Sequence, residues 1–318
     1  MTATETEIPV AIVGVGKIAR DQHMPSIERS PTFRLAAVVS RNAHVDGVEN
    51  FSTVGALLEA RPDIPALALC MPPQVRFEAA HAALLAGRHV MLEKPPGATI
   101  AEVRALQWLA TDKGCTLFAS WHSRYAHAVD DARQWLKERA VRHVSIVWKE
   151  DVRRWHPGQD WVWQAGGLGV FDPGINALSI LTAILPHPVH VTTSELSFPQ
   201  GRDAPIAARV DFANGRGAVV EAVFDWRQEG PQTWDIDVVT DDGTLKLSDG
   251  GARLAIDGAK RHAGDDREYD GLYARFANLI ATGTSDVDLS PLVHVADAFM
   301  LARRVNVAPF DDDSVSSA

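Results

Sequence analysis

The stretch that decides the fold is Pro9-Val10-Ala11-Ile12-Val13 followed by Gly14-Val15-Gly16-Lys17-Ile18-Ala19, near the start of the chain. The short apolar run predicts a buried β-strand, and it leads directly into a G-x-G-x-x-A pattern. The glycines permit a tight turn and a close approach of backbone to phosphate, and the alanine permits close packing of helix on strand. A helical run over residues 18–27 follows, so its N-terminus faces the turn. This context predicts a dinucleotide-binding unit.

Strands and helices continue to alternate after this turn. The expected strands are Phe33–Val39, Ala66–Cys70, His89–Leu92 and Thr116–Ala119, and the expected helices are Val75–Ala86 and Thr99–Asp112. Strands separated by helices of this length indicate a parallel, doubly wound sheet. We therefore predict an α/β chain whose residues 1–124 form a Rossmann dinucleotide-binding domain.

The end of the second strand bears on which dinucleotide binds. NAD enzymes usually carry an acid there for the ribose hydroxyls, but this chain has Ser40-Arg41. A hydroxyl and a guanidinium suit a ribose 2′-phosphate, so the sequence favours NADP, with NAD as the weaker alternative. The other interpretation is an arginine that faces solvent. Met71-Pro72 follows the next strand as a rigid loop that can lie over the cofactor.

The strand His89–Leu92 ends in Glu93-Lys94-Pro95-Pro96. The prolines keep the chain extended, so Lys94 lies at the carboxyl edge of the sheet, where ligands bind in open α/β folds. A lysine there can reach both a nicotinamide ring and a substrate hydroxyl. The alternative is an ordinary solvated Glu93–Lys94 pair. His122 follows the last strand at the same edge, where we weigh substrate contact against a structural role.

The second half of the chain, residues 125–318, changes in character. Strand-like runs joined by short turns are expected at Val141–Val147, His190–Phe198, Ile206–Phe212, Gly217–Trp226, Thr233–Val239, Thr244–Leu247 and Ala252–Ile256. This spacing predicts an α+β domain with a large, mostly antiparallel sheet. We expect this domain to serve substrate binding and oligomerisation. Two helices, Leu272–Thr282 and Pro291–Arg304, are expected to close it. Apolar residues along Ala218–Phe224 suggest a homodimer through an exposed sheet face.

Two segments of this half carry candidate functional residues, the first of a kind that binds sugars. The run Trp148–Trp163 holds four of the nine tryptophans among charged and amide side chains, and Glu150 and Trp155 are the preferred substrate contacts. A surface loop anchored by tryptophans is the alternative. The run Gly166–Asn176 leads into a helix, where Asp172 and Asn176 are four residues apart. Helix N-capping by Asp172 before Pro173 is the alternative to a role in proton transfer.

Composition narrows the classes of protein further. The 318 residues carry a formal net charge of −10, which argues against nucleic acid or an anionic membrane as a partner. The two cysteines fit a reducing compartment, and the acidic start, Met1–Glu7, does not resemble a signal peptide, so a cytoplasmic enzyme is expected. The His and Cys spacings do not suggest a metal site.

The glycine turn, Glu93-Lys94-Pro95 and the helix bearing Asp172 and Asn176 together resemble the glucose–fructose oxidoreductase / inositol dehydrogenase family over nearly the whole chain. The resemblance implies that Lys94 is catalytic or orients the substrate. The family's Asp-x-x-x-His helix carries Asn176 in place of histidine here, which shifts the role of base towards Asp172 or Lys94. The runs Trp148–Gln159 and Gly166–Asn176 resemble the bacterial L-arabinose 1-dehydrogenase / D-galactose 1-dehydrogenase subgroup.

This resemblance implies oxidation of L-arabinose or D-galactose at C1 to the aldonolactone. The expected catalytic residues are Lys94, Asp172 and Asn176, and the expected substrate contacts are His122, Glu150 and Trp155. The expected cofactor contacts are Gly14, Gly16, Lys17, Ile18, Ser40, Arg41, Met71, Pro72, Glu93 and Lys94. The alternatives are an inositol or trans-dihydrodiol dehydrogenase on the same frame, and a non-catalytic NAD(P)-binding sugar sensor.

Overall fold

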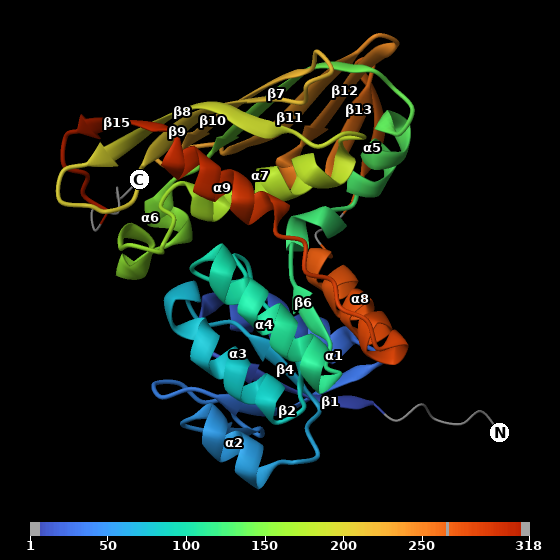
Figure 1. Ribbon diagram of the computed structural model, residues 1–318, viewed down its shortest axis with the longest axis vertical. Coiled ribbons are helices and arrows are strands. Elements are labelled where there is room, and N and C mark those ends of the chain that lie inside the picture. The colour runs from blue at the N-terminus through green and yellow to red at the C-terminus, as the bar shows by residue number, and fades with distance from the viewer. Residues whose placement is uncertain (1–6, 265–266, 313–318) are drawn as a thin grey trace. The chain divides into compact units, whose positions relative to one another are not determined.

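The computed structural model describes residues 7–264 and 267–312, which fall into two compact units (Figure 1). The first unit comprises residues 1–122 with residues 268–289, and the second comprises residues 123–267 with residues 290–318. The domain boundary expected after residue 124 lies close to this division. The expectation did not place residues 268–289 in the first unit. Residues 1–6, most of the acidic start, lie outside the described residues. None of the helices in the described ranges combines the length and hydropathy needed to span a bilayer.

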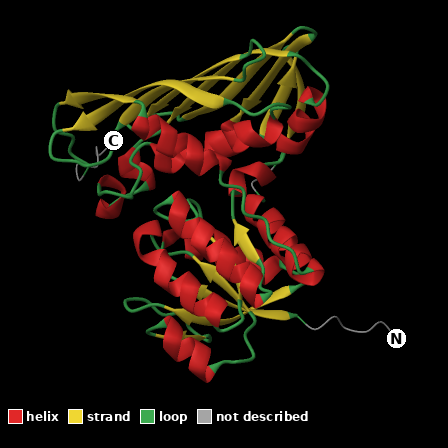
Figure 2. Cartoon of the chain, in the orientation of Figure 1, coloured by secondary structure: helices red, strands yellow, loops and turns green. Residues whose placement is uncertain are grey.

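The first unit is built on a six-stranded parallel sheet with the order β3-β2-β1-β4-β5-β6 (Figure 2). Its strands are β1 (Ile8–Val13), β2 (Phe33–Val39), β3 (Glu49–Phe51), β4 (Ala66–Leu69), β5 (His89–Leu92) and β6 (Leu117–Ala119). Its helices are η1 (Ala19–His23), α1 (Met24–Arg29), α2 (Val54–Ala60), η2 (Pro73–Val75), α3 (Arg76–Leu85), α4 (Ile100–Lys113) and α8 (Glu268–Thr282). The strand order reverses between β1 and β4, which confirms the predicted Rossmann sheet and places its switch point.

The helix after the glycine turn differs from the expected continuous run over residues 18–27. It begins as the π-helical turn η1 and becomes the α-helix α1 only at Met24. Pro25 explains the change, because it has no backbone N–H to donate to the carbonyl of Asp21 four residues earlier. Local signals elsewhere match the structure: Thr99 and Glu102 form a capping box on α4, and Gly114 ends that helix in the left-handed conformation.

The second unit contains a nine-stranded sheet with the order β14-β13-β12-β11-β7-β10-β9-β8-β15. Its strands are β7 (Val141–Lys149), β8 (His190–Pro199), β9 (Ala207–Ala213), β10 (Val219–Asp225), β11 (Thr233–Thr240), β12 (Gly243–Ser248), β13 (Arg253–Ile256), β14 (Ala259–Ala263) and β15 (Ala302–Val307). Its helices are α5 (Val129–Leu136), α6 (Val152–Trp155), η4 (Asp160–Trp163), α7 (Phe171–Ile184), η5 (Asp249–Gly251) and α9 (Ser290–Met300), and η3 (His122–Tyr125) lies at the boundary. Only the β7–β10 and β8–β15 pairs are parallel, so the predicted mostly antiparallel sheet is confirmed.

Helices α7 and α9 cover one face of this sheet (Figure 2). Phe224 on β10 packs against Phe171 on α7 with ring centroids 5.5 Å apart, and a Cβ on Gly174 would lie 2.8 Å from the Phe224 ring. Successive side chains of β10 point to opposite faces of the sheet, so the apolar residues expected to form a dimer face lie on both. Val220 and Phe224 are buried, while Val219 is 50% exposed. A homodimer through this sheet stays a prediction.

The C-terminal helix expected over residues 291–304 is wrong beyond Met300. Residues Ala302–Val307 instead form β15, which pairs in parallel with β8. This pairing joins segments about a hundred residues apart in sequence, so local periodicity cannot reveal it. Between β13 and β14, Asp257 and Gly258 both adopt positive φ in a two-residue hairpin turn.

Candidate active site

The turn after β1 has the form expected of a phosphate-binding turn. Gly14 has a φ of +92°, and a Cβ there would lie 2.7 Å from the backbone nitrogen of Met71, so only glycine fits. A Cβ on Gly16 would meet nothing within 4 Å, so the backbone of Gly16 borders open space. Lys17 is exposed and Ile18 is half-buried. This closely packed but accessible backbone fits the pyrophosphate of a dinucleotide.

Ser40 and Arg41 lie directly after the carboxyl end of β2, next to the strand that carries the glycine turn. The Ser40 hydroxyl accepts a hydrogen bond from the backbone N–H of Ala43 at 3.2 Å, and Arg41 is exposed. The hydroxyl thus shapes the loop, and the guanidinium is accessible to an anion. Their contact with a ribose 2′-phosphate stays a prediction.

The buried side chain of Arg76 joins the loops that follow β4 and β5. Its guanidinium donates to the carbonyl of Met71 at 2.5 Å and to the carbonyls of Glu93 and Pro95. Arg76 is 2% exposed, and Lys94 between the two latter residues is half-buried. The arginine therefore fixes the backbone on both sides of Lys94. Spacing along the chain does not single out Arg76, because these acceptors are backbone carbonyls, which residues of any type can supply.

Glu93 lies at the centre of a buried polar cluster. Its Oε1 accepts a hydrogen bond of 2.5 Å from the Tyr269 hydroxyl and lies 3.4 Å from Nε2 of His23, whose Nδ1 lies 2.9 Å from the Tyr273 hydroxyl. Burial alone would raise the pKa of Glu93, but the hydrogen bond and charge of His23 overcome it and lower the pKa to about 2. At 3% exposure Glu93 is not half of a solvated Glu93–Lys94 pair, and that alternative is wrong.

Replacing Glu93 by Gln should remove an acid-sensitive part of the protein's stability. Because the pKa of Glu93 falls from 4.5 to about 2 on folding, the carboxylate stabilises the folded state above pH 4.5. That contribution is lost as the pH falls from 4.5 towards 2. Urea unfolding at a series of pH values should show a smaller loss for Glu93→Gln than for wild type. The exposed Glu78→Gln serves as control, and parallel curves for Glu93→Gln and wild type would contradict the prediction.

His122 lies beyond the carboxyl end of β6, as predicted, and its partners in the first unit come from α8. Its Nδ1 hydrogen-bonds the Glu268 carboxylate, and its ring stacks on Tyr269 with centroids 5.3 Å apart. Burial would lower the pKa of His122, but the charge and hydrogen bond of Glu268 outweigh it and raise the pKa. The hydrogen bond to Glu268 and the stacking on Tyr269 fit a structural role for His122, and its position at the carboxyl edge of the sheet fits a contact with a substrate. Its contact with a substrate stays a prediction.

In the second unit, Asp172 and Asn176 lie on the first turns of α7. The helix begins at Phe171 with Val170 as its N-cap, so the alternative that Asp172 is the N-cap is wrong. Asp172 is 2% exposed, whereas Asn176 is half-buried among fully buried neighbours on the same helix. A carboxylate in the first turn is favoured by the helix dipole, and the spacing of four residues puts the amide on the same face.

His156, for which the sequence predicted no role, lies beside Asp172. Nε2 of His156 is 3.3 Å from Oδ2 of Asp172, and its Nδ1 is 3.3 Å from Oε1 of Gln159. The family's helix carries a histidine at the position that is Asn176 in this chain, so α7 itself provides no imidazole there. The tertiary structure thus supplies an imidazole from the tryptophan-rich segment instead. The signal available in the sequence was only that His156 lies within that segment.

The two preferred substrate contacts in this segment both bind residues of the stretch 226–234, which follows β10 and leads into β11. Glu150 is 5% exposed, and its two carboxylate oxygens accept hydrogen bonds from the indoles of Trp226 at 3.2 Å and Trp234 at 3.0 Å. The indole of Trp155 donates to Oε1 of Gln232 at 3.4 Å. These contacts fix both side chains in position. Contact of Glu150 or Trp155 with a sugar stays a prediction.

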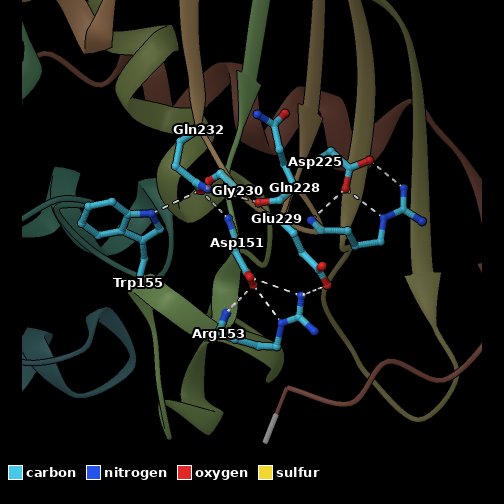
Figure 3. A network of polar contacts seen from close by, with 9 residues as sticks. Asp151, Arg153, Trp155, Asp225, Gln228, Glu229, Gly230 and Gln232 are labelled. Atoms are coloured by element: carbon cyan, nitrogen blue, oxygen red, sulfur yellow. Dashed lines mark hydrogen bonds and ion pairs between the residues drawn. The ribbon is translucent and has the colours of Figure 1, made fainter. Parts of the chain in front are cut away.

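Asp151 and Arg153 hold the segment to the loop between β10 and β11 (Figure 3). Arg153 binds Asp151 at 2.9 Å and Glu229 at 2.6 Å, while the Asp151 backbone N–H donates to Gln232 at 2.6 Å. Asp151 also caps the short helix α6 by accepting from the Arg153 backbone. Asp151 and Arg153 therefore stabilise the fold of this segment. Fewer of its side chains remain as candidate contacts to a sugar.

A doubly wound sheet, a glycine turn with accessible backbone and a fixed Glu-Lys-Pro turn define the class of dinucleotide-binding oxidoreductases. Residues 8–120 match the model of an oxidoreductase family with an NAD-binding Rossmann fold. Over 305 residues the chain is 45% identical to galactose 1-dehydrogenase from Pseudomonas fluorescens, covering 96% of this chain and 99% of that protein. The chain belongs to the glucose–fructose oxidoreductase / inositol dehydrogenase family.

Solved structures agree with this assignment. The crystal structure of D-galactose-1-dehydrogenase from Rhizobium etli is 56% identical and superposes with a TM-score of 0.93, covering 98% of this chain and all of that one. KijD10, a 3-ketoreductase from Actinomadura kijaniata, shares the fold with a TM-score of 0.81 at 19% identity, covering 95% of this chain and 100% of that one. Because KijD10 is only 19% identical to this chain, its similarity is evidence for a shared fold alone.

Proposed function

We propose that this protein is an aldose 1-dehydrogenase that oxidises D-galactose and L-arabinose at C1 to the aldonolactone, with NADP preferred over NAD. The observation that carries the proposal is near-full-length similarity to two proteins named galactose 1-dehydrogenase. The chemistry of α7 supports it, because a buried carboxylate beside an amide and an imidazole suits removal of a proton from a sugar hydroxyl.

In this proposal Asp172 accepts the proton of the C1 hydroxyl and the Asn176 amide orients that hydroxyl. Lys94 places a positive charge beside the oxygen as negative charge develops on it, and the Arg76 hydrogen bonds hold the lysine backbone for this role. When bound, the nicotinamide cofactor takes up the C1 hydrogen with its two electrons. Lys94 as the base, with Asp172 orienting the hydroxyl, is the alternative assignment of roles.

The proposed activity is tested by initial rates of cofactor reduction. The purified full-length protein is assayed with D-galactose, L-arabinose and myo-inositol, each with NADP and with NAD. Fast reduction with either aldose would support the proposal. Activity with inositol alone would point instead to the alternative polyol substrate. Tight NADP binding without turnover of any of the three would favour a sugar sensor.

Arg41→Ala should weaken use of NADP far more than use of NAD. A guanidinium that binds the 2′-phosphate contributes about 1.5–3 kcal/mol, so KM for NADP should rise roughly 10- to 100-fold while KM for NAD changes little. Steady-state kinetics with each cofactor at saturating sugar measures both values. Arg34→Ala, at an exposed position on β2, is the matched control. Equal effects on the two cofactors would remove Arg41 from the 2′-phosphate site.

A further inference from the structure

The residues that follow β15 return to the tryptophan-rich segment, residues 148–163 (Figure 1). The indole N–H of Trp163 donates to Oδ2 of Asp312 at 2.6 Å, across 149 positions of the chain. Trp163 is 3% exposed, so this N–H needs an acceptor inside the protein. Asp312 supplies that acceptor, although it lies far outside the segment in sequence.

Arg202 and Phe310 add further contacts at the same place. Arg202, in the turn between β8 and β9, binds Oδ1 of Asp312 at 2.5 Å, and its guanidinium lies 5.2 Å from the centre of the Trp163 ring. The ring of Phe310 lies 6.1 Å from that of Trp163 and 5.6 Å from the guanidinium of Arg153. Asp312 and Phe310 are therefore attached to the segment by a charge-assisted hydrogen bond, by aromatic packing and by a cation–π contact.

Trp163 also packs on a residue that holds a candidate sugar contact. Trp163 and Trp226 meet edge to face, with ring centroids 5.2 Å apart. The indole of the fully buried Trp226 donates to the carboxylate of Glu150, and its ring lies 5.3 Å from that of His156. A continuous series of packed side chains thus joins Asp312 to the candidate active site, and all of them belong to the second unit.

We propose that residues 310–312 set the affinity for the sugar by holding the tryptophan-rich segment in its binding conformation. This inference rests on the proposed sugar oxidation, in which Glu150 and Trp155 of that segment contact the substrate. Residues 310–312 are then positioning residues, because they act on the sugar site through Trp163. Binding is weakened when only a fraction of the molecules holds the site ready, so release of the segment should raise KM for the sugar.

The expected effect falls on sugar binding and not on the chemical step. The groups proposed to carry the chemistry are positioned by other elements: Lys94 by the turn that Arg76 binds, and Asp172 and Asn176 by α7. A looser tryptophan-rich segment weakens contacts that substrate and transition state share, so kcat should change little. A change that only destabilised the fold would lower the unfolding temperature without raising KM for the molecules that remain folded.

Two shortened chains test the role of residues 310–312 directly. A chain ending at Pro309 lacks the contacts of Phe310 and Asp312, whereas a chain ending at Asp312 keeps them and is the matched control. KM for D-galactose should rise roughly five- to tenfold in the first and stay within about twofold of the full-length value in the second, with KM for NADP unchanged in both. An unchanged KM for the sugar in the chain ending at Pro309, an equal rise in the two shortened chains, or an equal rise in KM for NADP would overturn the inference.

Point substitutions keep the inference testable if the chain ending at Pro309 does not fold. Asp312→Ala removes the acceptor of the Trp163 hydrogen bond, and Trp163→Phe removes the donor while it keeps an aromatic ring. Asp312→Ala should raise KM for the sugar about threefold or more in the otherwise wild-type chain, and less than about twofold in the Trp163→Phe background. The same increase in both backgrounds, or no increase in either, would contradict a hold that acts through Trp163.

Tryptic cleavage measures the hold on the segment without any substrate. Arg154 is an exposed arginine on α6 within the segment, so trypsin can cut after it when this short helix opens. The rate of that cut, followed by mass spectrometry below the unfolding temperature, should rise about fivefold or more in the chain ending at Pro309. The chain ending at Asp312 should match the full-length protein. Equal rates in all three proteins would show that residues 310–312 do not hold the segment.

The two readouts separate this inference from the proposed function. Cleavage needs neither sugar nor cofactor, so failure of every sugar in the rate assay would remove the proposed oxidation and leave the cleavage rates unaffected. Equal cleavage rates in proteins that oxidise D-galactose would overturn the role of residues 310–312 and leave the proposed function in place.

Discussion

Asp172→Asn should lower kcat for sugar oxidation by about 10²–10⁴-fold, the range that positioned acid–base groups supply. Asparagine keeps the size and hydrogen-bonding capacity of the side chain in this 2% exposed position, but it cannot accept a proton. KM for the sugar should change little, because the lost interaction belongs to the transition state. Steady-state rates with D-galactose and NADP measure both constants.

The matched control for this experiment is Asp160→Asn. Asp160 is an exposed aspartate in the turn η4 of the same unit, and its replacement should leave kcat unchanged. Thermal unfolding of both variants establishes that each is folded at the assay temperature. Near-normal turnover of a folded Asp172→Asn variant would eliminate Asp172 as the base and shift that role to Lys94.

Lys94→Met should lower kcat roughly 10²- to 10³-fold, the cost of removing one positive or hydrogen-bonding group that stabilises a developing oxyanion. Methionine retains most of the side-chain length, so packing around the half-buried position is largely kept. The backbone of the turn should stay in place, because Arg76 binds the carbonyls on either side of residue 94. Binding of NADP, measured by titration of the free enzyme, should be affected much less than turnover.

Lys113→Met is the control for Lys94→Met, since Lys113 is an exposed lysine in the last turn of α4. A kcat close to wild type in Lys94→Met would show that the charge is not used in the transition state. A comparable loss in Lys113→Met would instead indicate a general effect of reduced charge, and the specific role of Lys94 would fail.

Much of the first unit was predictable because its signals are local. The apolar run before Gly14 and the open backbone at Gly16 follow from residues adjacent in the chain. The strand before Glu93 and the helix that begins after Thr99 were likewise placed within a residue or two. The exception was the π-helical turn η1. Pro25 has no N–H to donate to the carbonyl four residues earlier, so its effect falls on the residues before it.

The candidate site was predictable only in part. Lys94 and His122 follow strand ends, and Asp172 and Asn176 share a helix face, so spacing along the chain was enough to select them. The partners that govern their chemistry were not accessible in the same way. Tyr269 reaches Glu93 across 176 positions, and Gln232 reaches Trp155 across 77 positions.

The sequence by itself determined the Rossmann sheet, the glycine turn and the residue types of the candidate site, because each depends on neighbours within one strand or one helical turn. Only the tertiary structure decided that β15 pairs with β8, that Glu93 is a buried anion held by His23 and Tyr269, and that His156 lies against Asp172. These contacts are stabilised by burial and long-range hydrogen bonding, which depend on how distant segments pack and leave no periodic pattern in the chain.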